Sequence, residues 1–166
     1  MEISRNTAKI DVVILAEYIL HKLGEMSHLK LQKLIYMVEG YHLAYFGGAS
    51  LINEDFQAWT HGPVCRKVFD ILKDKSILYG DVRYTQNNSK TLPSDILHKS
   101  LSSEQIELID EVLNLYKDES GVALESITHK QSPWINARKG LPYYAKCENV
   151  ISKVEMREYF NTLFEQ

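Results

Sequence analysis

The chain has 166 residues, which is enough for one domain with a substantial hydrophobic core. Hydrophobic residues make up 45% and charged residues 25%, typical of a soluble globular protein, and the net charge of -3 argues against a general attraction to nucleic acids or anionic membranes. The longest aliphatic run, residues 12–16, is too short to span a bilayer, so we expect no membrane partner.

The N-terminal residues, MEISRNTAKID, lack the apolar stretch of a signal peptide, and about residues 1–8 are expected to be a loose terminus. The two cysteines, Cys65 and Cys147, have no metal-type spacing. We interpret them as free thiols in a reducing compartment, which predicts a cytoplasmic protein.

A first helix is predicted after this terminus, because six apolar residues approximate a helical stripe and Gly24 can end it. The stripe consists of Ile10, Val13, Ile14, Ile19, Leu20 and Leu23. The link from Gly24 to the next predicted helix is very short, so the two helices should be immediate neighbours.

The stretch Ser27–Phe46 is predicted to be the central helix around which the rest of the chain is organised. Its apolar residues fall on more than one face, which is typical of a buried helix. Ser27 is a suitable N-cap, and Gly47 and Gly48 can end the helix. Four positions are expected to tolerate solvent: Lys30, Lys33, Glu39 and Gly40.

Signals after the central helix are weaker. A short strand is expected near Phe56–Trp59, and Pro63 suits the first position of another helix. Residues 76–100 are polar, so this segment is expected to be a long loop, with a small hairpin around Val82–Thr85 left open.

The C-terminal half is predicted to be helical. Leu101–Tyr116 is the clearest helix, since Ser102 and Gln105 form a capping-box pattern. Three further helices are predicted: one over Val122–His129, one opened by Ser132-Pro133 and stopping at Gly140, and a last one with a capping box of Ser152 and Glu155. The sequence therefore predicts a compact, mainly α, single domain over residues 1–166, with a minor β element near Phe56–Trp59.

A small metal- or thiol-dependent enzyme around His42, His61 and Cys65 is one reading of the polar residues. His61 and Cys65 lie four residues apart, and a helix dipole at Cys65 would lower its thiol pKa. However, no metal-ligand motif occurs, and no third orienting group is visible. We therefore interpret these side chains as structural and expect no metal, no cofactor and no small-molecule substrate.

A DNA-binding autorepressor is another reading, since the first two predicted helices could form a helix-turn-helix with His28, Lys30 and Lys33 on the recognition helix. A recognition helix must leave one face free for the groove. The apolar character of this helix on several sides argues against that role, so specific nucleic acid binding is not expected.

The block AWTHGPV, residues 58–64, is chemically dense. Trp59 can fill a core pocket and donate one hydrogen bond, and Gly62-Pro63 fixes the path of the chain. Taken alone, the block is interpreted as a structural corner rather than a binding edge. Trp134 is likewise interpreted as a core residue.

Five blocks in a fixed order carry a resemblance to a known family. They are LKLQKLIYMVEGYHLAYFG (29–47), FQAWTHGPV (56–64), LSSEQIELIDEVLNLY (101–116), LESITHKQSPWINAR (124–138) and ISKVEMREYF (151–160). Together they resemble the Panacea-domain antitoxins, also described as SocA-like or phage-associated GepA-like proteins. That family more often has an aromatic residue at the position of Met37 and commonly tyrosine at that of His61, which weakens a catalytic case built on His61.

The resemblance implies function by binding: an antitoxin that neutralises a protein toxin encoded nearby. It implies that eight residues form a partner-binding or scaffold motif: Tyr41, His42, Trp59, His61, Gly62, Pro63, Trp134 and Arg138. Trp59 is expected to be buried, and Arg138 is expected to be exposed. The toxin-specific contacts should lie on more variable surfaces, and the toxin's identity and the formation of a homo-oligomer are left open.

Overall fold

The structure is a computed structural model that describes residues 7–73, 78–85 and 91–164. These residues form eight helices and four short strands. In chain order they are α1 (Val12–Leu23), β1 (Met26–Ser27), α2 (His28–Tyr45), β2 (Gln57–Trp59), β3 (Gly62–Val64), α3 (Arg66–Leu72), β4 (Asp81–Val82), α4 (Pro93–Ser100), α5 (Ser103–Tyr116), α6 (Gly121–His129), α7 (Ser132–Ala137) and α8 (Lys153–Phe164). The prediction of a mainly α fold with a minor β element is confirmed.

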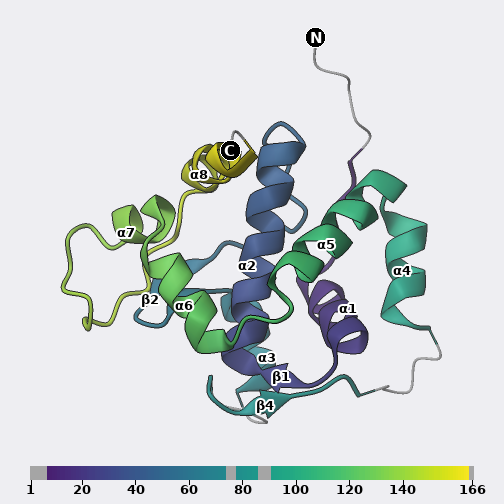
Figure 1. Ribbon diagram of the computed structural model, residues 1–166, viewed down its shortest axis with the longest axis horizontal. Helices are drawn as coiled ribbons and strands as arrows, with labels where there is room; N and C mark the ends of the chain where they lie inside the picture. Colours follow the sequence, from purple (N-terminus) through teal and green to yellow (C-terminus); the bar gives the residue numbers. More distant parts are fainter. Residues whose placement is uncertain (1–6, 74–77, 86–90, 165–166) are drawn as a thin grey trace.

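Helix α2 runs through the middle of the molecule, with α5, α6 and α8 packed around it (Figure 1). Its N-cap is Ser27, whose hydroxyl accepts a hydrogen bond from the Lys30 amide. At its other end the Gly48 amide donates to the Leu43 carbonyl, and Gly47 and Gly48 both have positive φ. This pattern matches a Schellman motif, so both predicted ends of the central helix are confirmed.

The predicted exposure of three α2 residues is wrong, because Lys33, Glu39 and Gly40 are all buried. Packing on every side explains the difference. The Glu39 carboxylate accepts from the Leu51 amide and from the Lys153 ammonium, at 2.7 and 2.9 Å. As a result, 15 of the 18 residues of α2 are buried.

The four strands form two small antiparallel pairs. β2 and β3 make a hairpin in which Ala58 lies opposite Pro63, and β1 pairs with β4. The strand predicted near Phe56–Trp59 is confirmed, but Pro63 does not begin a helix. It lies in β3, and α3 starts only at Arg66.

The predicted loop over residues 76–100 is wrong at its C-terminal end, where Pro93–Ser100 forms α4. Pro93 stands in the first turn of that helix, and Leu97 is fully buried in the core. Val82 pairs with Met26 of β1 rather than in a local hairpin. Residues 74–77 and 86–90 lie outside the described residues.

Local capping signals in the C-terminal half are largely confirmed. Ser102 and Gln105 form the predicted capping box of α5, and the Ser152 hydroxyl accepts from the Glu155 amide at the start of α8. The N-cap of α7 is Gln131, one residue earlier than predicted. Of the terminus expected to be loose, residues 1–6 lie outside the described part, while both backbone groups of Ala8 hydrogen-bond to Gln105. No helix in the described ranges is long and apolar enough to cross a membrane.

Candidate functional site

The β2–β3 hairpin carries four of the eight predicted motif residues and lies against α2 and α6. Gly62 at its turn has a φ of 97°, a conformation that residues with a side chain rarely adopt. A Cβ atom at Gly62 would lie 2.6 Å from Lys33 Cε and 2.7 Å from Thr128 Oγ1. The hairpin can therefore approach both helices this closely only with glycine at position 62.

Lys33 of α2 holds the hairpin through a hydrogen bond. Its side chain is completely buried, and its Nζ atom donates to the Pro63 carbonyl at 2.9 Å. Burial lowers the pKa of Lys33 to about 7, although the nearby Glu125 carboxylate acts in the opposite direction. At neutral pH this lysine is therefore close to its point of half-protonation.

A cluster of polar side chains joins the hairpin turn to α6. His61 Nδ1 lies 2.7 Å from Glu125 Oε1 and 3.0 Å from the Tyr79 hydroxyl. His129 Nε2 donates to the Thr60 carbonyl at 2.8 Å, and burial lowers the pKa of His129. These contacts hold the turn on α6 while leaving the His61 side chain 42% exposed.

Trp134 and Arg138 fix the opposite side of the hairpin. Trp134 is 4% exposed, and its indole Nε1 donates to the Trp59 carbonyl at 2.8 Å. Arg138 Nη1 donates to the Ala58 carbonyl at 2.8 Å, and the guanidinium lies 4.8 Å from the centre of the Trp134 ring. Trp134 is thus a core residue, as predicted.

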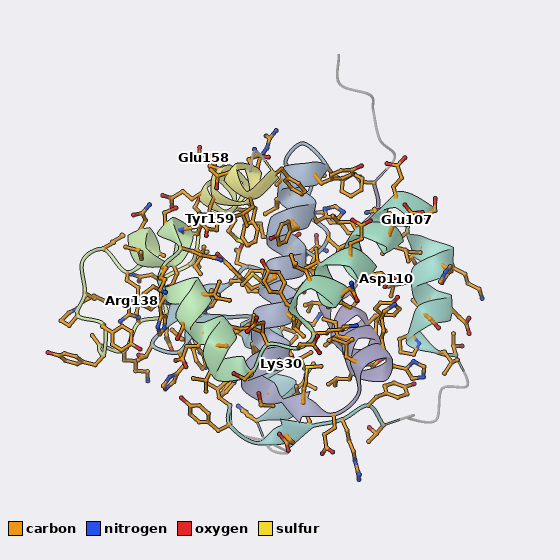
Figure 2. The ribbon with its side chains drawn as sticks, in the orientation of Figure 1. Lys30, Glu107, Asp110, Arg138, Glu158 and Tyr159 are labelled. Atoms are coloured by element: carbon orange, nitrogen blue, oxygen red, sulfur yellow. The ribbon has the colours of Figure 1, made fainter. Side chains whose placement is uncertain are left out.

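The predicted exposure of Arg138 and the predicted burial of Trp59 are both wrong. Arg138 is only 2% exposed, because the loop after α7 folds over its guanidinium. Figure 2 shows it on the side of the molecule that carries α7 and that loop. Trp59 is only half-buried, and its indole donates to Gln57 while its ring packs against Phe69.

The loop after α7 is a functional candidate that the sequence did not point to. Arg138 Nη2 donates to three of its carbonyls, those of Pro142, Tyr143 and Ala145. The turn-forming Leu141-Pro142 pair was the only local signal for this loop. Nothing in the sequence indicates that the side chain of Arg138 reaches the carbonyls of the loop.

A shallow groove of about 440 Å³ lies between the hairpin, α3 and this loop. It is lined by Trp59, Thr60, His61, Arg66, Phe69, Lys146, Cys147 and Glu148. The Arg66 guanidinium stands 5.7 Å from the centre of the Trp59 ring and 3.2 Å from Glu148. The groove therefore combines aromatic surface with charged side chains, which suits contact with another protein.

Tyr41 and His42 belong to a different part of the structure. The Tyr41 hydroxyl bonds to that of Tyr116 at 2.8 Å. His42 Nδ1 donates to the Ala49 carbonyl, and its Nε2 lies 3.0 Å from Gln105 Nε2. Burial lowers the pKa of His42 to about 4, so its imidazole is neutral and links α2 to α5.

The surroundings of Cys65 differ from those expected for a reactive thiol at the start of a helix. Cys65 is completely buried at the N-cap of α3, and burial raises its thiol pKa, which contradicts the expected lowering by the helix dipole. Its amide donates to Gln32, whereas His61 and His42 have the separate partners given above. Among the residues that the structure describes, no group of three or more His, Cys, Asp or Glu side chains could hold a metal ion.

Comparison with known proteins gives one family. A family model described as "Antitoxin SocA-like, Panacea domain" matches residues 31–135, which is more than half of the chain. The match includes the hairpin, α5, α6 and Trp134, and it ends before Arg138 and the loop that Arg138 holds. Neither the search of curated proteins nor that of solved structures found a match.

Proposed function

The chain belongs to the SocA-like antitoxin family with the Panacea domain, and from this premise we propose that it neutralises a protein toxin encoded by a neighbouring gene through direct contact. The family match over residues 31–135 is the observation that carries the proposal. No catalytic residue is needed, because a bound antitoxin can block its toxin by covering it.

The polar contacts that hold the hairpin support a binding role. Lys33, His129 and Arg138 each donate to a backbone carbonyl of the hairpin, and Glu125 lies against His61. Such contacts hold a scaffold in one conformation, which favours tight association because little ordering remains when the partner binds. We place this activity in the cytoplasm, in keeping with two buried free cysteines.

Co-expression with the product of the adjacent gene tests the proposal. Growth should be restored when this chain is present, and the two proteins should purify together. Cys65→Ser should leave both results unchanged, because a buried thiol can be replaced at modest loss of stability. A thermal melt of the variant serves as the folding control.

His61→Gln separates the binding role from an enzymatic one. Glutamine can still donate to Glu125, so the hairpin should keep its position, and any loss of growth should come with an equal loss of the complex. Restored growth without a detectable complex would contradict the proposal. So would a loss of neutralisation in Cys65→Ser or His61→Gln while the variant still forms the complex with the toxin, since chemistry would then be required.

A further inference from the structure

Two tyrosines stand at the tip of a tight turn in the loop after α7. The Ala145 amide donates to the Pro142 carbonyl at 2.9 Å, which closes a β-turn with Tyr143 and Tyr144 at its centre. Tyr143 is 61% exposed and Tyr144 is 80% exposed. Figure 1 shows the loop projecting from the side of the molecule that carries α7.

Arg138 holds the turn in place through hydrogen bonds. Its guanidinium donates to the carbonyls of Pro142, Tyr143 and Ala145, and also to that of Ala58 in the hairpin. The Tyr143 ring also packs edge-on against His129, with ring centres 4.8 Å apart. A turn fixed in this way presents its aromatic side chains with little backbone entropy left to lose on binding, and tyrosine is enriched at binding hot spots.

The flanks of the turn are basic, although the whole chain has a net charge of -3. Lys139 and Lys146 are exposed, and neither forms an ion pair with another described residue. Glu148, the acidic residue closest in sequence, is paired with Arg66 at 3.2 Å. This surface therefore complements a negatively charged partner.

We infer that residues 139–146, here called the tyrosine turn, form with the adjacent groove the surface that docks an acidic face of the toxin. The inference rests on the proposed function. In this arrangement Tyr143 and Tyr144 supply buried aromatic contact, while Lys139 and Lys146 meet carboxylates of the toxin. The tyrosine turn lies beyond residue 135, where the family match ends, so it is a feature through which this chain can select its own partner.

Titration calorimetry with the purified product of the adjacent gene tests the inference. The double variant Tyr143→Ala/Tyr144→Ala should bind at least about 100-fold more weakly, since two hot-spot side chains are lost. Lys139→Glu/Lys146→Glu should bind at least about tenfold more weakly, and its affinity should depend less on salt than that of the wild type.

Matched control variants on other faces are Leu115→Ala, for loss of an apolar side chain that is 62% exposed, and Lys99→Glu, for reversal of an exposed charge. Both should bind like the wild type. All variants should melt within a few degrees of the wild-type temperature, because the altered side chains are mostly exposed.

Three outcomes would overturn the inference. If the wild type binds and the turn variants bind equally well, the docking surface is wrong while the proposed function stands. If the controls lose as much affinity as the turn variants, the effect is not specific to the turn. If the wild type does not bind the adjacent product at all, the proposed function fails, and the inference fails with it.

Discussion

Arg138 connects the hairpin, α7 and the tyrosine turn through one buried guanidinium. Its two terminal nitrogens donate to four backbone carbonyls, and its Cζ atom lies 4.8 Å from the centre of the Trp134 ring. The Nε atom has no hydrogen-bond partner among the described residues. A planar donor group with several N–H bonds can satisfy carbonyls from separate segments at once, which a lysine ammonium on a flexible stem cannot do in the same geometry.

Arg138→Ala should therefore destabilise the protein, by about 2 kcal/mol or more, because it removes the donor to the buried Ala58 carbonyl and the guanidinium that packs against Trp134. Urea denaturation of the wild type and of the alanine variant measures the difference in unfolding free energy. The stability of Arg138→Lys should lie between those of the wild type and the alanine variant, since one ammonium can replace only part of the hydrogen bonding. A loss below about 1 kcal/mol in the alanine variant would contradict the structural role given to Arg138.

Lys33 should make stability depend on pH. Its pKa is lowered to about 7 in the folded protein, whereas an unfolded lysine titrates near 10.5. Between these values the unfolded chain binds a proton that the folded chain lacks, so stability should rise with pH across this window. The slope from this one group is at most about 1.4 kcal/mol per pH unit.

The variant Lys33→Met isolates this contribution, because methionine keeps an unbranched side chain without a titrating group. Urea denaturation of both proteins at pH 7, 8 and 9 gives the difference in unfolding free energy. The unfolding free energy of the wild type should increase relative to that of the variant as the pH rises. A difference that stays constant with pH would mean that Lys33 keeps its ordinary pKa in the folded state.

Helices α2 and α8 pack directly against each other, and their contact depends on Gly40. The ring of Phe160 lies directly against the Gly40 backbone, in the space that a Cβ atom would occupy. Phe160 is completely buried there and also packs on Tyr36 and Tyr41. Glycine within a helix is intrinsically unfavourable, so its presence in the middle of α2 is explained by the packing of α8.

Gly40→Ala should destabilise the protein by about 1–3 kcal/mol, although alanine favours the helix by about 1 kcal/mol at an unconstrained position. The cause is overlap between the added methyl group and the Phe160 ring. Thermal and urea denaturation check the result. Combining Gly40→Ala with Phe160→Leu should cost less than the sum of the two single changes, because the smaller side chain makes room. Simple additivity would argue against the contact.

The whole molecule is built around a helix that has no free face. Packing of α5, α6 and α8 covers α2, so this helix cannot enter a DNA groove without unfolding its surroundings (Figure 1). A partner can therefore contact only the outer surface, which includes the tyrosine turn and the groove beside the hairpin.

Duplex DNA should accordingly bind weakly and without sequence preference. The net charge of -3 supplies no overall attraction to phosphates. Gel shifts with the DNA upstream of the protein's own gene, at physiological salt, are the measurement. Nanomolar binding that disappears when the DNA sequence is scrambled would contradict this prediction and support the hypothesis of a DNA-binding autorepressor.

The sequence by itself determined the features that depend on residues within one or two helical turns. The central helix, its Ser27 cap and its glycine end follow from local periodicity and capping, as does the capping box of α5. The block AWTHGPV was found for the same reason, since its unusual composition can be read directly from the chain. The packing of this block against α2 and α6 could not be predicted from the local sequence.

Only the tertiary structure decided which polar side chains are buried. Lys33, Glu39 and Arg138 look like surface residues in the sequence, but their partners come from distant segments: the Pro63 carbonyl, the Lys153 ammonium and the Ala58 carbonyl. Pairing of β1 with β4 and the helix at Pro93–Ser100 are likewise stabilised by contacts from elsewhere in the chain. Burying a charge is tolerable only where such partners compensate for the lost water, and no local pattern records where those partners will be.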